Sequence, residues 1–182
     1  MHAIDKLVIA EKHSVAKAFA KALIQKEPTP KFFKHVPFYM LNAENSSWAI
    51  VGLKGHIMDF DFDKHLNNWK SIDPIELFNM QPKMIIRAES RAHVELLREL
   101  GRYAETVYLA LDGDSEGESI AFEAMNIIRS VNPYAEFKRL WFSDTLPQTL
   151  IHALSNPRSP NKNLADKCFA RMEIDLTIGA AF

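Results

Sequence analysis

The sequence predicts an α/β fold in which a mainly parallel sheet is covered by helices on both faces. Short apolar runs alternate with segments of helical periodicity along the chain, which favours strand–helix–strand units. Two runs, residues 7–10 and 107–111, are continuously apolar, as is typical of strands buried on both faces. The 182 residues, 47% of them hydrophobic, suffice for one well-buried domain with a small appendage.

The first half of the chain contains one clear strand–helix unit. Residues 7–10 form its strand, and Ser14 is predicted to cap a helix that ends before Pro28. The next segments are predicted from their composition: an irregular stretch at 31–47, strands at 48–51 and 55–62, and a loop with helical fragments at 63–82.

The second half repeats the alternation of strands and helices. A helix capped by Ser90 is closed by Gly101, and Asp144 or Thr145 is predicted to cap another helix that has Pro147 in its first turn. The remaining predictions are strands at 84–86, 107–111 and 137–142, a helix at about 117–129, and a last helix at roughly 163–180 after a break at 156–161.

Composition excludes several classes of protein. No stretch approaches 18 uninterrupted apolar residues, so no membrane span is expected, and the N-terminus lacks the apolar core of a signal peptide. The single Cys168 excludes an internal disulfide, fits a reducing cytoplasm and is expected to be a buried thiol. Net charge is −1, but residues 1–38 carry seven lysines against three acids, and residues 112–123 carry five carboxylates and no base.

Residues 112–118, here called the acidic turn, follow the strongest predicted strand. Asp112, Asp114 and Glu116 alternate, so an extended segment would place all three on one side. Carboxylate oxygens without His or Cys favour Mg²⁺, Mn²⁺ or Ca²⁺ over zinc. Glu11 also follows directly after a buried strand, so Glu11 and Asp112 are expected at the same carboxyl edge of the sheet.

Two alternatives for the acidic turn need weighing. Its spacing, with Glu123 further on, nearly matches an EF-hand calcium loop, but an EF-hand requires a helix before the loop, and residues 107–111 predict a strand. The other alternative is a solvated acidic turn without metal, since carboxylates favour helix N-termini.

The chain resembles the catalytic Toprim domain of type IA DNA topoisomerases, in the topoisomerase III-like and archaeal branch. Five segments carry the resemblance, and they occur in the family's order. They are the opening strand with Glu11-Lys12, the Gly55-His56 segment, the Asp-x-Asp-x-Glu-Gly-Glu signature at 112–118, the segment Arg139-Leu-Trp-Phe142-Ser-Asp-Thr145, and residues 170–179 around Arg171. His13 stands where the family often has Pro, and Ser115 stands where many members have Arg.

The resemblance implies a Rossmann-like Toprim domain at 1–157 and the start of a DNA-binding helical domain at 158–182. It implies an ATP-independent enzyme, without a nucleotide cofactor, that breaks and reseals single DNA strands through a 5′-phosphotyrosyl intermediate. No tyrosine of this chain lies in the family's tyrosine motif, so the chain is expected to be an N-terminal fragment that does not relax DNA alone. Expected partners are single-stranded DNA and the remaining domains of the parent enzyme, in the cytoplasm at the nucleoid.

The resemblance also implies roles for individual residues. Glu11 is the candidate acid in cleavage and base in resealing, and Lys12 is expected to neutralise the phosphate. Mg²⁺ is the expected cofactor, with Asp112, Asp114 and Glu116 as its ligands and Glu118 in support. Candidate DNA contacts are Lys12, His56, Arg139 and Arg171. A structural histidine, pairing of Arg139 with the acidic turn, and an Arg171–Asp175 surface ion pair are the alternatives for the last three.

Two other functions remain open. A Toprim-type nuclease or primase-like protein would share the glutamate and the Asp-x-Asp pair but act without a tyrosine; the match at 170–179 argues against it. A non-catalytic metal or nucleic-acid binding module would not need Glu11 for activity.

Overall fold

In the computed structural model, which describes residues 3–64 and 73–181, six strands form a mixed sheet in the order β2-β3-β4-β1-β7-β8. The four strands β4, β1, β7 and β8 are parallel, and β2 and β3 add an antiparallel edge. The strands are β1 (Ile4–Ala10), β2 (Lys31–Phe33), β3 (Val36–Ala43), β4 (Ser46–Gly52), β7 (Ala104–Ala110) and β8 (Glu136–Arg139). The predicted fold class is confirmed.

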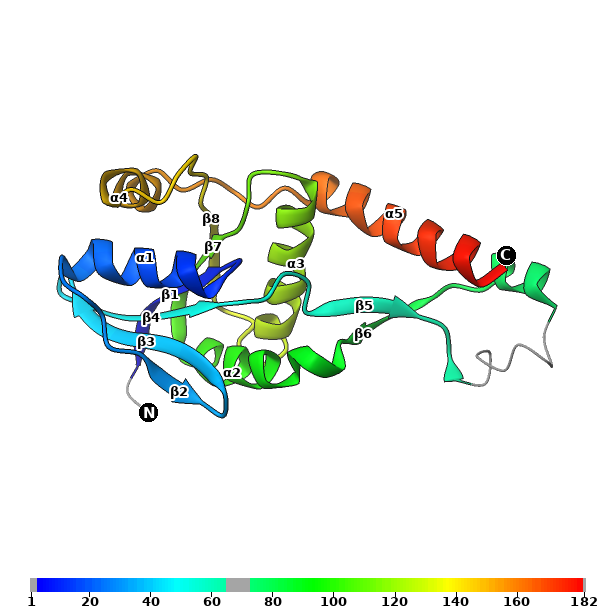
Figure 1. The fold of residues 1–182 in the computed structure, drawn as a ribbon, viewed down its shortest axis with the longest axis horizontal. Helices are drawn as coiled ribbons and strands as arrows, with labels where there is room; N and C mark the ends of the chain where they lie inside the picture. The colour runs from blue at the N-terminus through cyan, green and yellow to red at the C-terminus, as the bar shows by residue number, and fades with distance from the viewer. Residues whose placement is uncertain (1–2, 65–72, 182) are drawn as a thin grey trace.

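Helices cover both faces of this sheet (Figure 1). Alternate residues of β1 point into two separate apolar cores, one on each face. Leu7 and Ile9 belong to the apolar core shared with α2 and α3, whereas Val8 and Ala10 belong to a second core shared with α1 and α4. A strand buried on both faces must be apolar throughout, which explains the unbroken run in the sequence. The helices are α1 (His13–Ile24), α2 (Arg91–Gly101), α3 (Ser115–Arg129) and α4 (Pro147–Ser155).

An arm extends from this body (Figure 1). It consists of the antiparallel pair β5 (Met58–Asp61) and β6 (Lys83–Ile86), the 3₁₀ helix η2 (Pro74–Asn79) and helix α5 (Lys162–Ala181); a second 3₁₀ helix, η3 (Ala88–Ser90), leads into α2. Cys168 of α5 is buried, as predicted, and Ser119 Oγ of α3 lies 3.2 Å from its sulfur. This contact, together with apolar packing, holds the first half of α5 against the body.

Residues 31–47 were expected to be irregular, and that prediction was wrong. They form β2 and most of a hairpin in which β3 pairs with β4. Glu44 and Asn45 both have positive φ, the geometry of a tight hairpin turn that matches the twist of the strands. This turn lacks the glycine that usually marks it in a sequence, so the hairpin was overlooked.

Several predicted helix boundaries shift by a few residues. Helix α1 begins at His13 with Lys12 as its N-cap rather than Ser14, and α4 begins after Leu146 rather than Asp144. Asp144 still stabilises the turn that leads into α4, because its Oδ1 accepts a hydrogen bond from the Leu146 N–H at 2.9 Å. This bond lowers the pKa of the Asp144 carboxyl. Part of the predicted loop at 63–82 lies outside the described residues. None of the described helices is long and apolar enough to cross a bilayer.

Candidate active site

Glu11 and Asp112 meet at the carboxyl edge of the sheet. Their strands, β1 and β7, are adjacent and parallel, and Ala10 pairs with Ala110 at the end of the ladder. The backbone N–H of Asp112 donates to Oε2 of Glu11 at 3.0 Å, across 101 positions of sequence. The predicted convergence of these two segments is confirmed.

The acidic turn leaves the extended conformation sooner than predicted. Asp114 is the N-cap of α3, and its Oδ1 accepts a 2.7 Å hydrogen bond from the Gly117 N–H. Glu116 therefore lies in the first helical turn, where its Oε1 is 3.3 Å from Nε2 of His56. The prediction of three carboxylates along one side of an extended segment is wrong in its geometry, because capping α3 takes precedence.

The donor chemistry of the turn nevertheless suits a hard cation. Asp112, Asp114 and Glu116 are all exposed, and among residues 3–64 and 73–181 the Asp112 carboxylate has no hydrogen bond or ion pair. In that part of the chain no three His, Cys, Asp or Glu side chains are yet arranged to hold a metal. Asp112, Asp114 and Glu116 are the residues of the turn that could hold such an ion.

Two glycines allow backbone segments of the site to lie very close to one another. A Cβ at Gly117 would lie 2.0 Å from the carbonyl oxygen of Asp112, so the turn folds back onto α3 only because residue 117 has no side chain. A Cβ at Gly52 would lie 2.4 Å from the backbone N of His13. Glycine at 52 therefore lets the end of β4 approach the Glu11-Lys12 segment.

We expect Gly117→Ala to lower the free energy of unfolding by about 1–3 kcal/mol, the usual cost of overpacking. The reason is that the turn or the first turn of α3 must move away from the new methyl group. Gly179→Ala is the matched control, since a Cβ there meets nothing within 4 Å and alanine favours helix α5. Urea unfolding of both variants checks this, and equal effects at the two glycines would contradict it.

A buried ion pair holds the backbone of the acidic turn in place. Arg139 Nε lies 2.9 Å from Oε2 of Glu118, and both side chains are fully buried. The other Oε of Glu118 accepts the N–H of Asn161, just before α5, at 2.6 Å. The Arg139 guanidinium also donates to the carbonyls of Leu109, Leu111, Asp112 and Leu140.

This burial bears on the roles predicted for two residues, Arg139 and Glu118. Arg139 pairs with the acidic turn, as one alternative held, but the proposed contact with DNA is wrong because none of its side chain reaches the surface. Glu118 holds the end of β8, the turn and the start of α5 together, and its supporting role at a metal site stays a prediction.

His56 connects Glu116 of the acidic turn with Glu123 further along α3. Its Nδ1 lies 2.7 Å from Oε1 of Glu123, a fully buried carboxylate whose other oxygen accepts the N–H groups of Ile57 and Met58. Hydrogen bonding to Glu123, reinforced by the negative charges of Glu123 and Glu116, raises the pKa of His56 above its ordinary value of 6.5. The structure thus supports a bracing role for His56.

Glu123 was considered in the sequence only as an EF-hand ligand. It lies inside α3 and follows a strand and a turn rather than a helix, so the rejection of the EF-hand is confirmed. Glu123 lies seven residues after Glu116, and residues seven apart share one face of a helix. This spacing was the signal in the sequence that both carboxylates could reach the same side chain.

We expect the imidazole of His56 to titrate above pH 6.5 in the metal-free chain, and that of His93, whose pKa burial lowers, to titrate below it. Because the folded-state pKa of His56 is raised, its contribution to stability is complete below pH about 6.5 and is lost as the pH rises through the raised value. Histidine NMR spectra against pH measure both values. Glu123→Gln should bring the His56 pKa down, and an unchanged value would contradict the stated cause.

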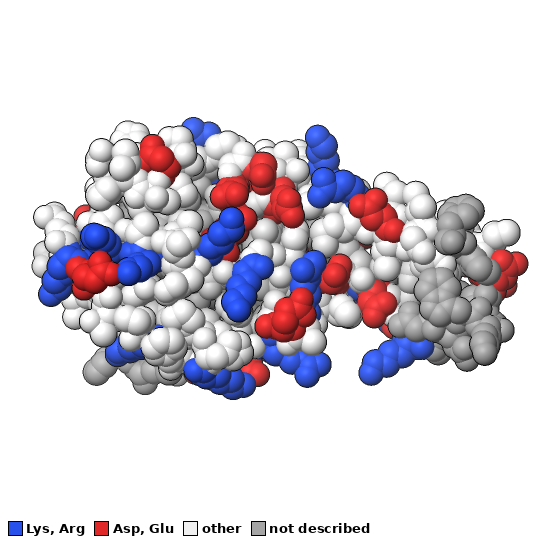
Figure 2. Space-filling view, viewed as in Figure 1, with Lys and Arg blue, Asp and Glu red and all other residues white. Residues whose placement is uncertain are grey.

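The remaining predicted cations are accessible. Lys12 and Arg171 are exposed, and neither forms an ion pair within the described part of the chain; the alternative Arg171–Asp175 pair is not formed there. Figure 2 shows a group of acidic side chains over the N-terminal end of α3 with basic side chains beside it. His13 stacks on Tyr39, with its Nε2 3.2 Å from the phenol oxygen.

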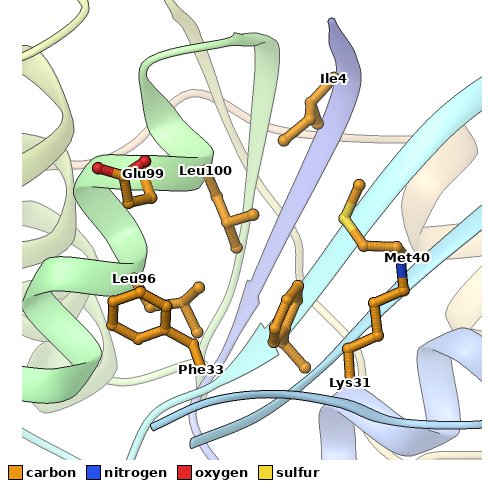
Figure 3. Close-up of a pocket in the computed structure, with 8 residues that line it drawn as sticks. Ile4, Lys31, Phe33, Met40, Leu96, Glu99 and Leu100 are labelled. Carbon is orange, nitrogen blue, oxygen red and sulfur yellow. The ribbon is translucent and has the colours of Figure 1, made fainter. Parts of the chain in front are cut away.

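A separate apolar pocket lies away from this edge (Figure 3). It has a volume of about 270 Å³ and lies between the β2–β3 hairpin, the beginning of β1 and α2. Ile4, the first residue of β1, is among the residues that line it, so the pocket belongs to the amino edge of the sheet, opposite the acidic turn. Lys31 and Glu99 are the charged residues that line it, a poor set for phosphoryl chemistry.

The chain is similar in sequence to known proteins. A family model described as the Toprim domain matches residues 6–145. The chain is 36% identical over 174 residues to DNA topoisomerase 1 of Archaeoglobus fulgidus, covering 96% of this chain and 26% of that protein. It is 33% identical to DNA topoisomerase 3 of Dictyostelium discoideum (97% and 22% covered) and 30% identical to human DNA topoisomerase 3-alpha (97% and 18%).

The fold is also found in a solved structure. Full-length topoisomerase I from Thermotoga maritima superposes with a TM-score of 0.59 at 20% identity, covering 93% of this chain and 24% of that chain. At this identity the likeness concerns the fold. The chain spans between about a fifth and a quarter of the length of these relatives.

Proposed function

Because the chain belongs to the Toprim family, we propose that it is the metal-binding catalytic domain of a type IA DNA topoisomerase, which breaks and reseals single DNA strands through a 5′-phosphotyrosyl intermediate. The observation that carries the proposal is the contact between Glu11 and the backbone of Asp112. It brings a proton-exchanging carboxylate to the start of the acidic turn at the ligand-binding edge of a parallel sheet.

Glu11 supplies the acid and base. One of its oxygens is held by the Asp112 N–H, which fixes the carboxylate and leaves its second oxygen for substrate. In cleavage Glu11 gives a proton to the departing 3′-oxygen, and in resealing it takes the proton from the 3′-hydroxyl. Lys12, the exposed N-cap of α1, stabilises the negative charge on the phosphate.

The acidic turn would hold Mg²⁺ through Asp112, Asp114 and Glu116. When bound, the ion supplies charge stabilisation and aligns the 3′-hydroxyl for resealing. The buried Arg139–Glu118 pair keeps the carbonyl of Asp112 in place, so this part of the turn is preorganised before DNA arrives.

The nucleophile comes from elsewhere in this proposal. Of the four tyrosines, Tyr39 and Tyr108 are buried in the sheet, and Tyr103 and Tyr134 lie away from the site at the amino edge of the strands. The chain also covers only a fraction of its relatives. We therefore assign the attacking tyrosine to another domain of a longer parent, with single-stranded DNA as substrate and residues 158–182, including α5 and Arg171, as the start of the adjoining DNA-binding domain.

Supercoiled plasmid incubated with this chain and Mg²⁺ tests the proposal against its main rival. We expect neither relaxation nor nicking by the chain alone, and relaxation once the parent's tyrosine domain is joined to it. Mg²⁺-dependent nicking by the chain alone, abolished by Asp112→Asn, would instead establish the nuclease alternative.

A further inference from the structure

An exposed tryptophan lies directly against the acidic turn. Trp141 follows β8, the strand beside β7, and 38% of its surface is accessible. A Cβ built on Gly113 would lie 3.1 Å from its ring carbons Cε3 and Cζ3, so the indole packs on the turn where that turn has no side chain.

Arg158 places a cation on the same ring. Its guanidinium carbon lies 5.0 Å from the ring centroid of Trp141, and its backbone is tied to Arg139 by two hydrogen bonds of 2.7 and 2.8 Å. Arg139 is also near the ring, at 5.8 Å, but its donors are taken up by Glu118 and by four backbone carbonyls. Arg158 is exposed and forms no ion pair among the described residues, so its charge is available to a ligand.

The order of the strands puts this pair on the far side of the turn from Lys12. Strand β7, which leads into the acidic turn, lies between β1, which leads to Lys12, and β8, which leads to Trp141. Cationic groups therefore flank the carboxylates on both sides along the carboxyl edge. A single strand crossing this edge meets Lys12, the acidic turn, and then Trp141 with Arg158.

We propose that Trp141 and Arg158 form a nucleobase-stacking site that seats one base of the single strand next to the bond that is cut. This inference rests on the proposed function and adds a substrate contact to it. A base suits the surface because every base has a π face that stacks on an indole, while the guanidinium of Arg158 adds a cation–π contact and neutralises the adjacent phosphate. Stacking of this kind is tolerant of sequence, so the site fixes position rather than base identity.

Binding of a labelled single-stranded oligonucleotide to the chain, followed by fluorescence anisotropy, tests the site. Trp141→Leu keeps an apolar side chain but loses the π face, and we expect it to weaken binding about 5- to 150-fold, the range for loss of one stacked base. Trp141→Phe keeps a ring and should remain within about threefold of the parent chain. Arg158→Gln should lower the slope of log affinity against log salt by roughly 0.7, the value for one phosphate contact on a single strand.

An oligonucleotide of equal length made of abasic residues separates stacking from charge. The parent chain should bind it more weakly than the normal strand, and Trp141→Leu should bind it as the parent does. Equal binding of both oligonucleotides by the parent, or no effect of Trp141→Leu on the normal strand, would overturn the stacking site. If Lys12→Ala still weakens binding in that case, the proposed function stands without the stacking site. Absence of any single-strand binding by the parent chain would overturn both the stacking site and the proposed function.

Discussion

Replacing Glu11 by glutamine, in a protein that carries both this chain and the tyrosine domain, is expected to slow DNA cleavage and resealing by about 10²- to 10⁴-fold, the usual contribution of a general acid–base group. Glutamine keeps an oxygen that can accept the Asp112 N–H, so the local fold should survive. It cannot release or take up a proton at that position. The loss therefore isolates proton transfer from structure.

Single-turnover rates of covalent adduct formation and of resealing measure this effect. Glu27→Gln is the matched control, since Glu27 is an exposed glutamate paired with Lys17 and Lys21 at the other end of α1. It should leave both rates within about twofold of the parent. Full activity of the Glu11→Gln protein would favour the non-catalytic binding module over an enzyme.

Replacing Arg139 by methionine is expected to lower the free energy of unfolding by about 3–5 kcal/mol. The substitution leaves the carboxylate of Glu118 fully buried without its cation, and four backbone carbonyls lose a donor. An uncompensated buried charge costs far more than the surface ion pairs elsewhere in the chain, where the median contribution is about 0–1 kcal/mol.

Two controls separate charge from packing at this pair. Adding Glu118→Met to Arg139→Met removes the stranded charge and should recover a large part of the loss, although the carbonyls remain without a donor. Lys162→Met, which breaks an exposed pair with Asp166, should change stability by less than about 1 kcal/mol. Urea unfolding followed by circular dichroism gives all three values; an Arg139→Met effect no larger than that of Lys162→Met would contradict the structural role.

The architecture of the site could be predicted because it follows from the ends of buried strands. Residues 7–10 and 107–111 are apolar on both faces, so they had to lie inside a parallel sheet, and Glu11 and Asp112 had to emerge at its carboxyl edge. Burial of Cys168 followed from the general behaviour of free thiols. These predictions depend on hydrophobic patterning, which a single sequence displays directly.

What could not be predicted depends on contacts between distant polar residues. Nothing local to Arg139 shows that Glu118 and four carbonyls surround it, and nothing near His56 shows that Glu123 lies behind it. The conformation of Glu116 depended on a competition between an extended turn and an N-cap at Asp114, which the capping hydrogen bond decided. The hairpin of β3 and β4 was missed because its turn residues, Glu44 and Asn45, adopt positive φ without glycine.

Binding of a divalent ion at the acidic turn is the central claim, and paramagnetic broadening by Mn²⁺ in an NMR spectrum of this chain tests it most directly. We expect Mn²⁺ to broaden the amide signals of Asp112, Gly113 and Asp114 first, Mg²⁺ to restore them by competition, and Asp112→Asn to weaken the effect markedly. Broadening centred on another part of the chain, or broadening of the turn that Asp112→Asn leaves unchanged, would contradict the account.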